Sequence, residues 1–442
     1  MTALATQITH VDGRSTALPA FAARSVVAVA AALGALLTLL SGRYGFHRDE
    51  LYFMAAGDRL AWGYTDQPPL TPLLAKLSTT VFGDTPAGLR MVATLAATLT
   101  IVVVALIARE LGGGPVPQLV AAVCAAASAL VLAFGHIFFT GTFDLLAWLA
   151  ITWLVLRLLR TGDPRWYLAI GAVAGVGLLN KRLVALLLVG LLISVLVVGP
   201  RRVLRTWWLL AGIAVALAVA SPNLIWEATH GFPQLTVAAG LSSEDGGENR
   251  MTFVMMQALQ LSPLLVPVWV AGLVRLWRDP QVRWARAFAV VYPLLAAVML
   301  ATGGSSYYVV PLLLVLVAAG AVPVVRWART RARLRLLVAG LTVAAAVSAV
   351  ITLPVLPPST AGMLAAVNEQ QGEQIGWPEM VRTVADAWYQ LPPDQRERAV
   401  IMGFNYGETG AIEHYGPALG LPAPYSGHMS YYDWGPPPDI AD

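Results

Sequence analysis

Residues 25–53, with the sequence SVVAVAAALGALLTLLSGRYGFHRDELYF, decide the fold class of this chain. The 18 residues between Arg24 and Arg43 carry no charge, which is the length and composition of a membrane-spanning helix. An acidic pair, Asp49 and Glu50, follows that run. Ionisable groups beside hydrocarbon are costly, so this pair is a candidate functional site. The alternative is a solvated loop with a helix-capping aspartate.

Composition extends this membrane assignment to the whole chain of 442 residues. Hydrophobic residues make up 57% and charged residues only 12%, against about 25% charged residues in soluble domains. The net charge of +4 is explained by membrane topology, so we expect contact with membrane lipids and no nucleic-acid partner. The single cysteine, Cys124, lies within an apolar run, where we expect it to pack.

Apolar runs of about 20 residues predict an all-α polytopic protein with about 11 transmembrane helices. The predicted spans are residues 25–42, 87–108, 116–135, 142–159, 166–180, 183–199, 206–225, 253–274, 285–302, 307–325 and 336–354. Gly171 and Gly175 form a small-xxx-small pattern, which favours close helix packing in the fifth span.

The distribution of arginine indicates the orientation of these spans. With a cytoplasmic amino terminus, clusters such as Arg201 with Arg202, and Arg331 with Arg333, fall in cytoplasmic loops, as the positive-inside rule requires. We therefore expect a multi-pass protein of the plasma membrane. Its predicted regions are a cytoplasmic tail at 1–24, a membrane domain at 25–354 with a long first extracytoplasmic loop at 43–86, and an extracytoplasmic domain at 355–442.

The two long outer segments have their own predicted structure. Residues 49–62 and 70–82 read as interfacial helices, separated by prolines that stop a helix. In the tail, residues 376–390 read as a helix and 399–404 as a strand, which predicts a small α/β domain.

Several motifs together resemble one known family. They are Arg48-Asp49-Glu50-x-Tyr52-Phe53, Gly63-Tyr64-x-Asp66-Gln67-Pro68-Pro69-Leu70, Phe143-Asp144-Leu145-Leu146, Gly177-Leu178-Leu179-Asn180-Lys181, Pro222-Asn223-Leu224-Ile225-Trp226-x-x-x-His230-Gly231-x-Pro233 and Tyr307-Tyr308-x-x-Pro311. The pattern, from about 40 to 320, is similar to GT-C membrane glycosyltransferases. It most resembles the branch akin to protein O-mannosyltransferases (glycosyltransferase family 39) and the lipid A aminoarabinose transferase.

This resemblance implies an enzyme that moves a sugar from a polyprenyl-phosphate carrier to an acceptor at the outer face, with inversion and without a nucleotide sugar. The acceptor is left open between a protein, a glycan and a lipid. Relatives have a longer tail domain, so we expect the outer domain at 355–442 to be incomplete, which affects acceptor recognition.

Acidic residues are the candidate catalytic groups. An acceptor hydroxyl needs a base, and Asp49 occupies the position of the family's catalytic aspartate. Glu50 either shares the site or holds the loop. Asp144 opens the fourth span on its outer side, where it can orient the acceptor or a metal ion, or act only as a helix cap.

Basic and phenolic residues are the candidate contacts to the donor phosphate. Lys181 and Arg182 lie at the outer end of the fifth span, where the positive-inside rule disfavours cations; snorkelling to lipid headgroups is the alternative. Tyr307 and Tyr308 can donate phenolic hydrogen bonds, although interfacial tyrosines are common in membrane proteins. Arg250 is a further candidate of the same kind.

A divalent metal ion at the donor phosphate is a second implication of the resemblance. Asp66 and His230 match the positions that hold such an ion in some family members, and no other cofactor is expected. A lone histidine is usually not a ligand, so metal dependence stays open.

Two other function classes fit the composition. A secondary transporter also has many spans and few charges, but it usually shows two related halves, and no repeat is apparent here. A non-catalytic partner of cell-envelope glycan assembly would tolerate loss of Asp49 and Asp144.

Overall fold

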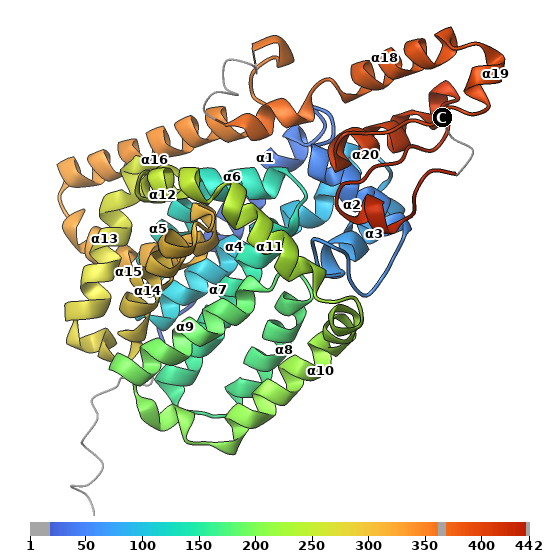
Figure 1. Cartoon of the computed structure of the whole chain (residues 1–442). Coiled ribbons are helices and arrows are strands. Elements are labelled where there is room, and N and C mark those ends of the chain that lie inside the picture. The colour runs from blue at the N-terminus through green and yellow to red at the C-terminus, as the bar shows by residue number, and fades with distance from the viewer. Residues whose placement is uncertain (1–17, 361–367, 439–442) are drawn as a thin grey trace, which may run out of the picture.

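The computed structural model describes residues 18–360 and 368–438, and both ranges are mainly helical (Figure 1). Residues 1–17, which form most of the predicted cytoplasmic tail, lie outside the described residues. The same holds for residues 361–367 and 439–442 of the predicted outer domain.

Each of the eleven predicted spans coincides with one helix or with a bent pair of helices. They are α1 (Ala23–Leu40), α4 (Pro86–Glu110), α5 with α6 (Pro115–Ala126 and Ala129–His136), α7 (Thr140–Thr161), α8 (Trp166–Leu178), α9 (Leu183–Val198), α10 (Trp207–Thr229), α12 with α13 (Gly246–Leu259 and Val266–Arg278), α14 (Ala287–Thr302), α15 (Val310–Trp327) and α16 (Arg331–Thr352). Connecting helices are η1 (Arg201–Leu204), α11 (Pro233–Glu244), η2 (Pro263–Leu265), η3 (Pro280–Ala285) and η4 (Ser306–Val309).

The expected number of eleven full-length spans is not confirmed. Within the described residues, 6 helices are long and apolar enough to cross a membrane, or up to 8 if each bent pair counts as one span. Three predicted spans, α8, α9 and α14, are shorter apolar helices. At about 1.5 Å per residue, a 13-residue helix such as α8 is shorter than the roughly 30 Å hydrocarbon core.

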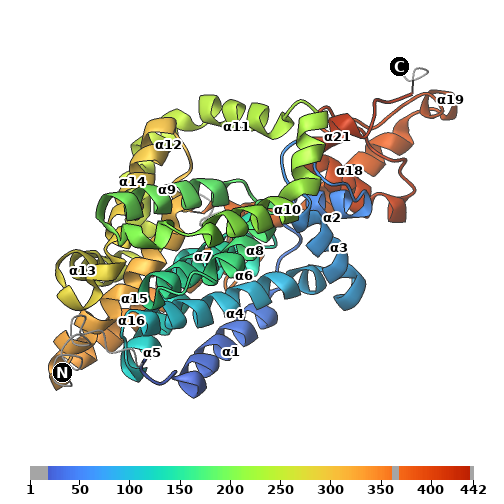
Figure 2. The same cartoon turned by 90° about the horizontal axis from the view of Figure 1, so that it is seen from below.

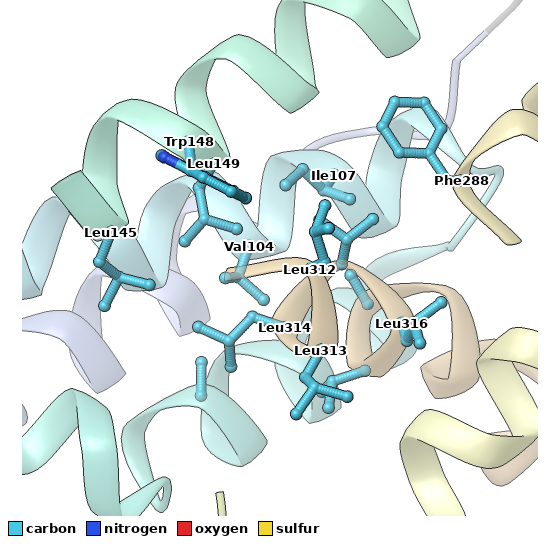
Figure 3. Packing of buried hydrophobic residues seen from close by; sticks show 14 of the residues in the cluster. Val104, Ile107, Leu145, Trp148, Leu149, Phe288, Leu312, Leu313, Leu314 and Leu316 are labelled. Carbon is cyan, nitrogen blue, oxygen red and sulfur yellow. The ribbon is translucent and has the colours of Figure 1, made fainter. Parts of the chain in front are cut away.

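The core of the bundle forms where α4, α7 and α15 meet. Almost every residue of α15 from Val310 to Val322 is buried, whereas α16 runs along the outside of the bundle (Figure 1). Cys124 is buried in the same core cluster, so its predicted packing role is confirmed. Figure 3 shows part of the cluster, with Val104 and Ile107 from α4, Leu145, Trp148 and Leu149 from α7, and Leu312, Leu313, Leu314 and Leu316 from α15.

Small residues let α8 and α10 approach closely, as the Gly171 and Gly175 pattern predicts. A Cβ added at Gly171 would lie 2.1 Å from the carbonyl oxygen of Gly212, and one at Gly175 would lie 2.9 Å from that of Ala216. The two helix backbones are therefore in direct contact, which larger side chains would prevent.

The first loop contains the two predicted helices, α2 (Arg48–Asp58) and α3 (Leu70–Phe82). The side chain of His47 caps α2, and Glu50 completes a capping box by accepting from the backbone N–H of His47. α2 ends four residues earlier than predicted.

The tail is helical and packs on the first loop. It contains η5 (Glu369–Gln374), α18 (Trp377–Gln390), α19 (Pro393–Arg396), α20 (Tyr406–Tyr415), η6 (Pro417–Leu419) and α21 (Ser430–Asp433). Figures 1 and 2 both show it against α2 at one end of the bundle. The helix predicted at 376–390 is confirmed.

The strand predicted at residues 399–404 is wrong. Within the described residues this segment makes one isolated bridge, between Met402 and Tyr425, and joins no sheet. A strand needs an extended partner, and here pairing ends after two backbone bonds, Gly403 N–H to Tyr425 and Tyr425 N–H to Ile401. The expected α/β character of the tail is therefore not confirmed.

Candidate active site

Asp49 lies in the first turn of α2, at the place where the first loop contacts the tail. Its backbone N–H donates to Nδ1 of His47 at 3.1 Å. The Tyr406 hydroxyl donates to Oδ1 of Asp49 at 2.7 Å, and Arg48 Nε lies 3.7 Å from the same oxygen. The Asp49 side chain is 26% exposed, so it remains accessible to a substrate.

A cavity of about 680 Å³ opens beside Asp49. Its walls come from α6, α12 with η2, α16, η4 and residues 368–370 of the tail. Apolar side chains cover most of the bundle side, whereas the acidic and basic side chains come from the first loop and the tail. The apolar lining includes Leu130, Phe134, Ile137, Met256, Leu259, Val347 and Ile351, and the polar lining includes His47, Arg48, Asp49, Gln260, Asn368 and Glu369.

Lys181 and two tyrosines form a cationic group at this cavity. Tyr307 lines the cavity, and Nζ of Lys181 lies 3.4 Å from its hydroxyl oxygen. The same Nζ lies 4.5 Å from the centroid of the Tyr308 ring, within the range of a cation–π contact. Lys181 reaches this place because the chain turns after α8, where its N–H bonds to the Gly177 carbonyl.

Asp144 is the buried acidic member of the group. It lies in the first turns of α7 and is 5% exposed, and its Oδ1 has no hydrogen-bond partner among the described residues. Lys181 interacts electrostatically with Asp144. Both Asp49 and Asp144 act electrostatically on the Tyr307 hydroxyl. Contacts and electrostatic interactions thus link five of the predicted site residues, and two of these, Asp49 and Tyr307, line the cavity.

The chain is similar to one protein-family model and to several solved structures. A family model described as dolichyl-phosphate-mannose-protein mannosyltransferase matches residues 66–226. No curated protein sequence matches the chain. Among solved structures, ArnT from Cupriavidus metallidurans bound to undecaprenyl phosphate is similar, with a TM-score of 0.64 at 15% identity over 91% of this chain and 85% of ArnT.

Two further solved structures share this architecture. The oligosaccharyltransferase AglB from Archaeoglobus fulgidus, in complex with an inhibitory peptide and a dolichol-phosphate, gives a TM-score of 0.54 at 12% identity, over 90% of this chain and 64% of AglB. The arabinofuranosyltransferase AftD from Mycobacteria gives 0.50 at 19% identity, over 80% of this chain and 29% of AftD. The chain has the GT-C glycosyltransferase fold.

Glu50 is placed differently from Asp49 in this GT-C fold. Glu50 and Arg90 are both fully buried and form a bidentate pair, with Nε to Oε1 and Nη2 to Oε2 each at 2.7 Å. The backbone N–H groups of His47 and Phe138 also donate to Glu50, each at 2.8 Å. All these bonds are structural, which supports the loop-holding alternative rather than a catalytic role for Glu50.

The predicted metal ligands Asp66 and His230 have separate partners. The Tyr52 hydroxyl donates to Asp66 at 2.5 Å, and burial raises the pKa of Asp66 to about 6. The ring of His230 stacks on Trp226, with centroids 4.1 Å apart. In residues 18–360 and 368–438, no group of three or more His, Cys, Asp or Glu side chains is placed to hold an ion. The pair stays a prediction.

Arg182 and Arg250 lie outside the Lys181 group. Arg182 donates to Gln234 at 2.7 Å and pairs with Oε1 of the buried Glu227, also at 2.7 Å. Arg250 is exposed and reaches the carbonyl of Ala301 at 3.3 Å. Glu227 already balances the charge of Arg182, which weakens the case for Arg182 as a phosphate contact.

Sequence reasoning missed the residues that the tail and α4 bring to the site. Tyr406 contacts Asp49 from the tail, and Arg90 fixes Glu50 from within α4. Gln374 of the tail accepts from both Arg90 and the ring of His136, each at 3.2 Å if the histidine is protonated at Nε2. An arginine inside the predicted span at 87–108, close to its start, was a usable signal for Arg90. No comparable signal marked Tyr406.

Proposed function

We propose that this chain is an inverting glycosyltransferase that moves a sugar from a polyprenyl-phosphate donor to an acceptor hydroxyl at the outer face of the membrane, with Asp49 as general base. The observation that carries the proposal is the shared cavity, which Asp49 and Tyr307 both line. Its apolar side suits an isoprenoid chain. The similar structures of ArnT and AglB were solved with undecaprenyl phosphate and dolichol-phosphate, respectively, which supports this donor class.

The proposed reaction is a single displacement at the anomeric carbon. The acceptor hydroxyl gives its proton to Asp49 while its oxygen forms the new bond to the anomeric carbon. The bond from that carbon to the phosphate oxygen breaks at the same time, and its electron pair leaves with the polyprenyl phosphate. Attack from the face opposite the leaving group inverts the configuration.

Lys181, Tyr307 and Tyr308 are the proposed receivers of the leaving phosphate. Negative charge grows on the phosphate oxygen as the bond breaks, and a cation with phenolic donors stabilises it. Asp144 interacts electrostatically with Lys181, and its proposed role is to orient the acceptor. Arg182 and Arg250 are not needed for this step.

The proposed location is the plasma membrane, with the amino terminus cytoplasmic and the tail outside. The positions of the arginine clusters support this orientation. The acceptor is a protein, a glycan or a lipid. Asp66 and His230 stay the proposed residues that would hold a divalent metal ion at the donor phosphate.

The test is release of polyprenyl phosphate from a labelled polyprenyl-phosphate sugar by the purified protein. Asp49→Asn should lower the rate by roughly 10²- to 10⁴-fold, because the base is lost. Asp58→Asn is the matched control, since Asp58 is an exposed carboxylate on the same helix. Full activity in Asp49→Asn would refute the base. A transporter would instead carry the donor across vesicles without cleaving it.

A further inference from the structure

The tail places one side chain directly on the proposed base. Tyr406 is the first residue of α20, and its hydroxyl donates to Oδ1 of Asp49 at 2.7 Å. Burial, and then the negative charge of Asp49, raise the pKa of Tyr406. The phenol therefore stays protonated and remains a hydrogen-bond donor at physiological pH.

The ring of Tyr406 is held on two sides. It stacks on His428 with centroids 5.2 Å apart and an interplanar angle of 7°, and its centroid lies 5.0 Å from that of Tyr52. The backbone N–H of Tyr406 donates to Nδ1 of His428 at 3.2 Å. These contacts fix the direction of the hydroxyl, so the bond to Asp49 does not depend on a freely rotating side chain.

Two glycines let α20 lie close enough to α2 for this contact. A Cβ added at Gly407 would lie 2.8 Å from Cβ of Arg48, and one at Gly410 would lie 3.1 Å from Cβ of Leu51. Larger residues at these positions would push α20 away from α2. The approach of the two helices is thus built into the sequence of the tail.

The two oxygens of Asp49 have different surroundings. Oδ1 accepts from Tyr406, and Arg48 Nε lies 3.7 Å from it. Oδ2 faces Nδ1 of His47 at 3.9 Å, but that nitrogen already accepts from the Asp49 N–H and cannot also donate. In the described part of the chain, no group donates a hydrogen bond to Oδ2, which leaves this oxygen for a substrate.

We propose that Tyr406 is a positioning residue for Asp49: it binds Oδ1, stabilises the ionised carboxylate and directs Oδ2 toward the acceptor hydroxyl. The inference rests on the proposed function of Asp49. It makes the tail part of the active site rather than a separate recognition module. The other ionisable groups around Asp49 are His47 and Arg48 beside it, Asp66 from the first loop and Tyr307 from η4.

The kinetic test compares Tyr406→Phe with Tyr432→Phe, an exposed tyrosine of the same tail. Phenylalanine keeps the stacking on His428 and removes only the hydroxyl. We expect kcat to fall roughly 10- to 100-fold, the loss of one hydrogen bond to a charged group, with the KM for the donor nearly unchanged. The acid limb of the pH profile should move to higher pH, because the ionised carboxylate has lost a hydrogen-bond donor. Tyr432→Phe should match the wild type.

A second measurement does not depend on catalysis. Dicyclohexylcarbodiimide modifies protonated carboxyl groups, and peptide mass spectrometry reports its addition at Asp49 as a function of pH. In Tyr406→Phe, labelling at Asp49 should persist to higher pH than in the wild type. An unchanged labelling profile and an unchanged kcat would overturn the role of Tyr406. A shifted profile in a protein that transfers no sugar would overturn the proposed function alone.

Discussion

Asp49 and Glu50 are adjacent residues with opposite surroundings. Successive side chains of a helix point about 100° apart, so Asp49 faces the cavity while Glu50 faces the core. Asp49 is 26% exposed, and Glu50 is fully buried against Arg90. Two adjacent carboxylates thus have different roles: Asp49 is the proposed base, and Glu50 holds the first loop in place.

Loss of the buried pair should destabilise the protein. Glu50→Gln leaves the Arg90 guanidinium without a counter-charge in the core, and breaking a buried pair in this way costs about 3–5 kcal/mol. We expect a clear drop in the melting temperature of the detergent-solubilised protein. Lys76→Met is the control, because Lys76 makes a pair of the same 2.7 Å length with Asp58 on the surface. Equal melting temperatures for the two variants would contradict this reading.

The residue scale also shows what the sequence could and could not predict. Asp49, Asp144, Lys181, Tyr307 and Tyr308 were named from motifs and outer-rim position, and the structure places them together. They are far apart along the chain, but the helices that carry or precede them were predicted at the right positions. The partner of Arg182 was not predictable, because Glu227 comes from a different helix and is recognised only by its contact.

At the scale of the secondary-structure elements, hydrophobic periodicity predicted where the helices lie better than how long they are. All eleven apolar segments are helices, since burial of apolar runs in a membrane leaves few other choices. The sequence patterns did not predict the bends within two of the spans, α5 with α6 and α12 with α13. The α12–α13 pair turns by 67° at Ser262 and Pro263, where Ser262 has a φ of 137° and proline lacks an N–H. The prediction of a strand at 399–404 was wrong because the partner of a strand is set by the tertiary structure, which the local sequence does not show.

The contact between α8 and α10 also positions Lys181, which follows α8. Gly171→Leu should force these helices apart, since even a Cβ would lie 2.1 Å from the Gly212 oxygen. Overpacking of this kind costs about 1–3 kcal/mol, and a displaced Lys181 should raise the KM for the donor. Gly340→Leu in α16 is the matched control, because a Cβ there meets nothing within 4 Å. Thermal unfolding and donor titration measure both effects.

At the scale of the whole molecule, the first loop and the tail form one unit over the end of the bundle (Figure 2). Arg59 pairs with Glu413 at 2.6 Å, and Gly45 donates its N–H to the Gln374 carbonyl at 3.0 Å. The sequence predicts residues 43–86 and 355–442 as separate regions. Their association depends on side-chain contacts across hundreds of residues, which no local pattern encodes.

The orientation of this unit is open to a direct test. Cys124 is the single cysteine and is buried, so single-cysteine variants can be made in a Cys124→Ala background. We expect Pro358→Cys to react with a membrane-impermeant maleimide in intact cells and Arg335→Cys to react only after lysis, because Arg335 lies in the first turns of α16 and Pro358 lies beyond its other end. The Cys124→Ala protein is the unlabelled control. The reverse pattern would place the proposed site in the cytoplasm.

The bond between Tyr406 and Asp49 joins residues 357 positions apart. Every helix of the bundle is synthesised before Tyr406 emerges from the ribosome. The bundle helices of a nascent chain can therefore insert into the bilayer before the Tyr406 hydroxyl is available to donate its hydrogen bond to Asp49. Under the proposed function, full activity would then arrive only after Tyr406 has been made, and a chain that stops before Tyr406 would lack the hydrogen bond that positions its base.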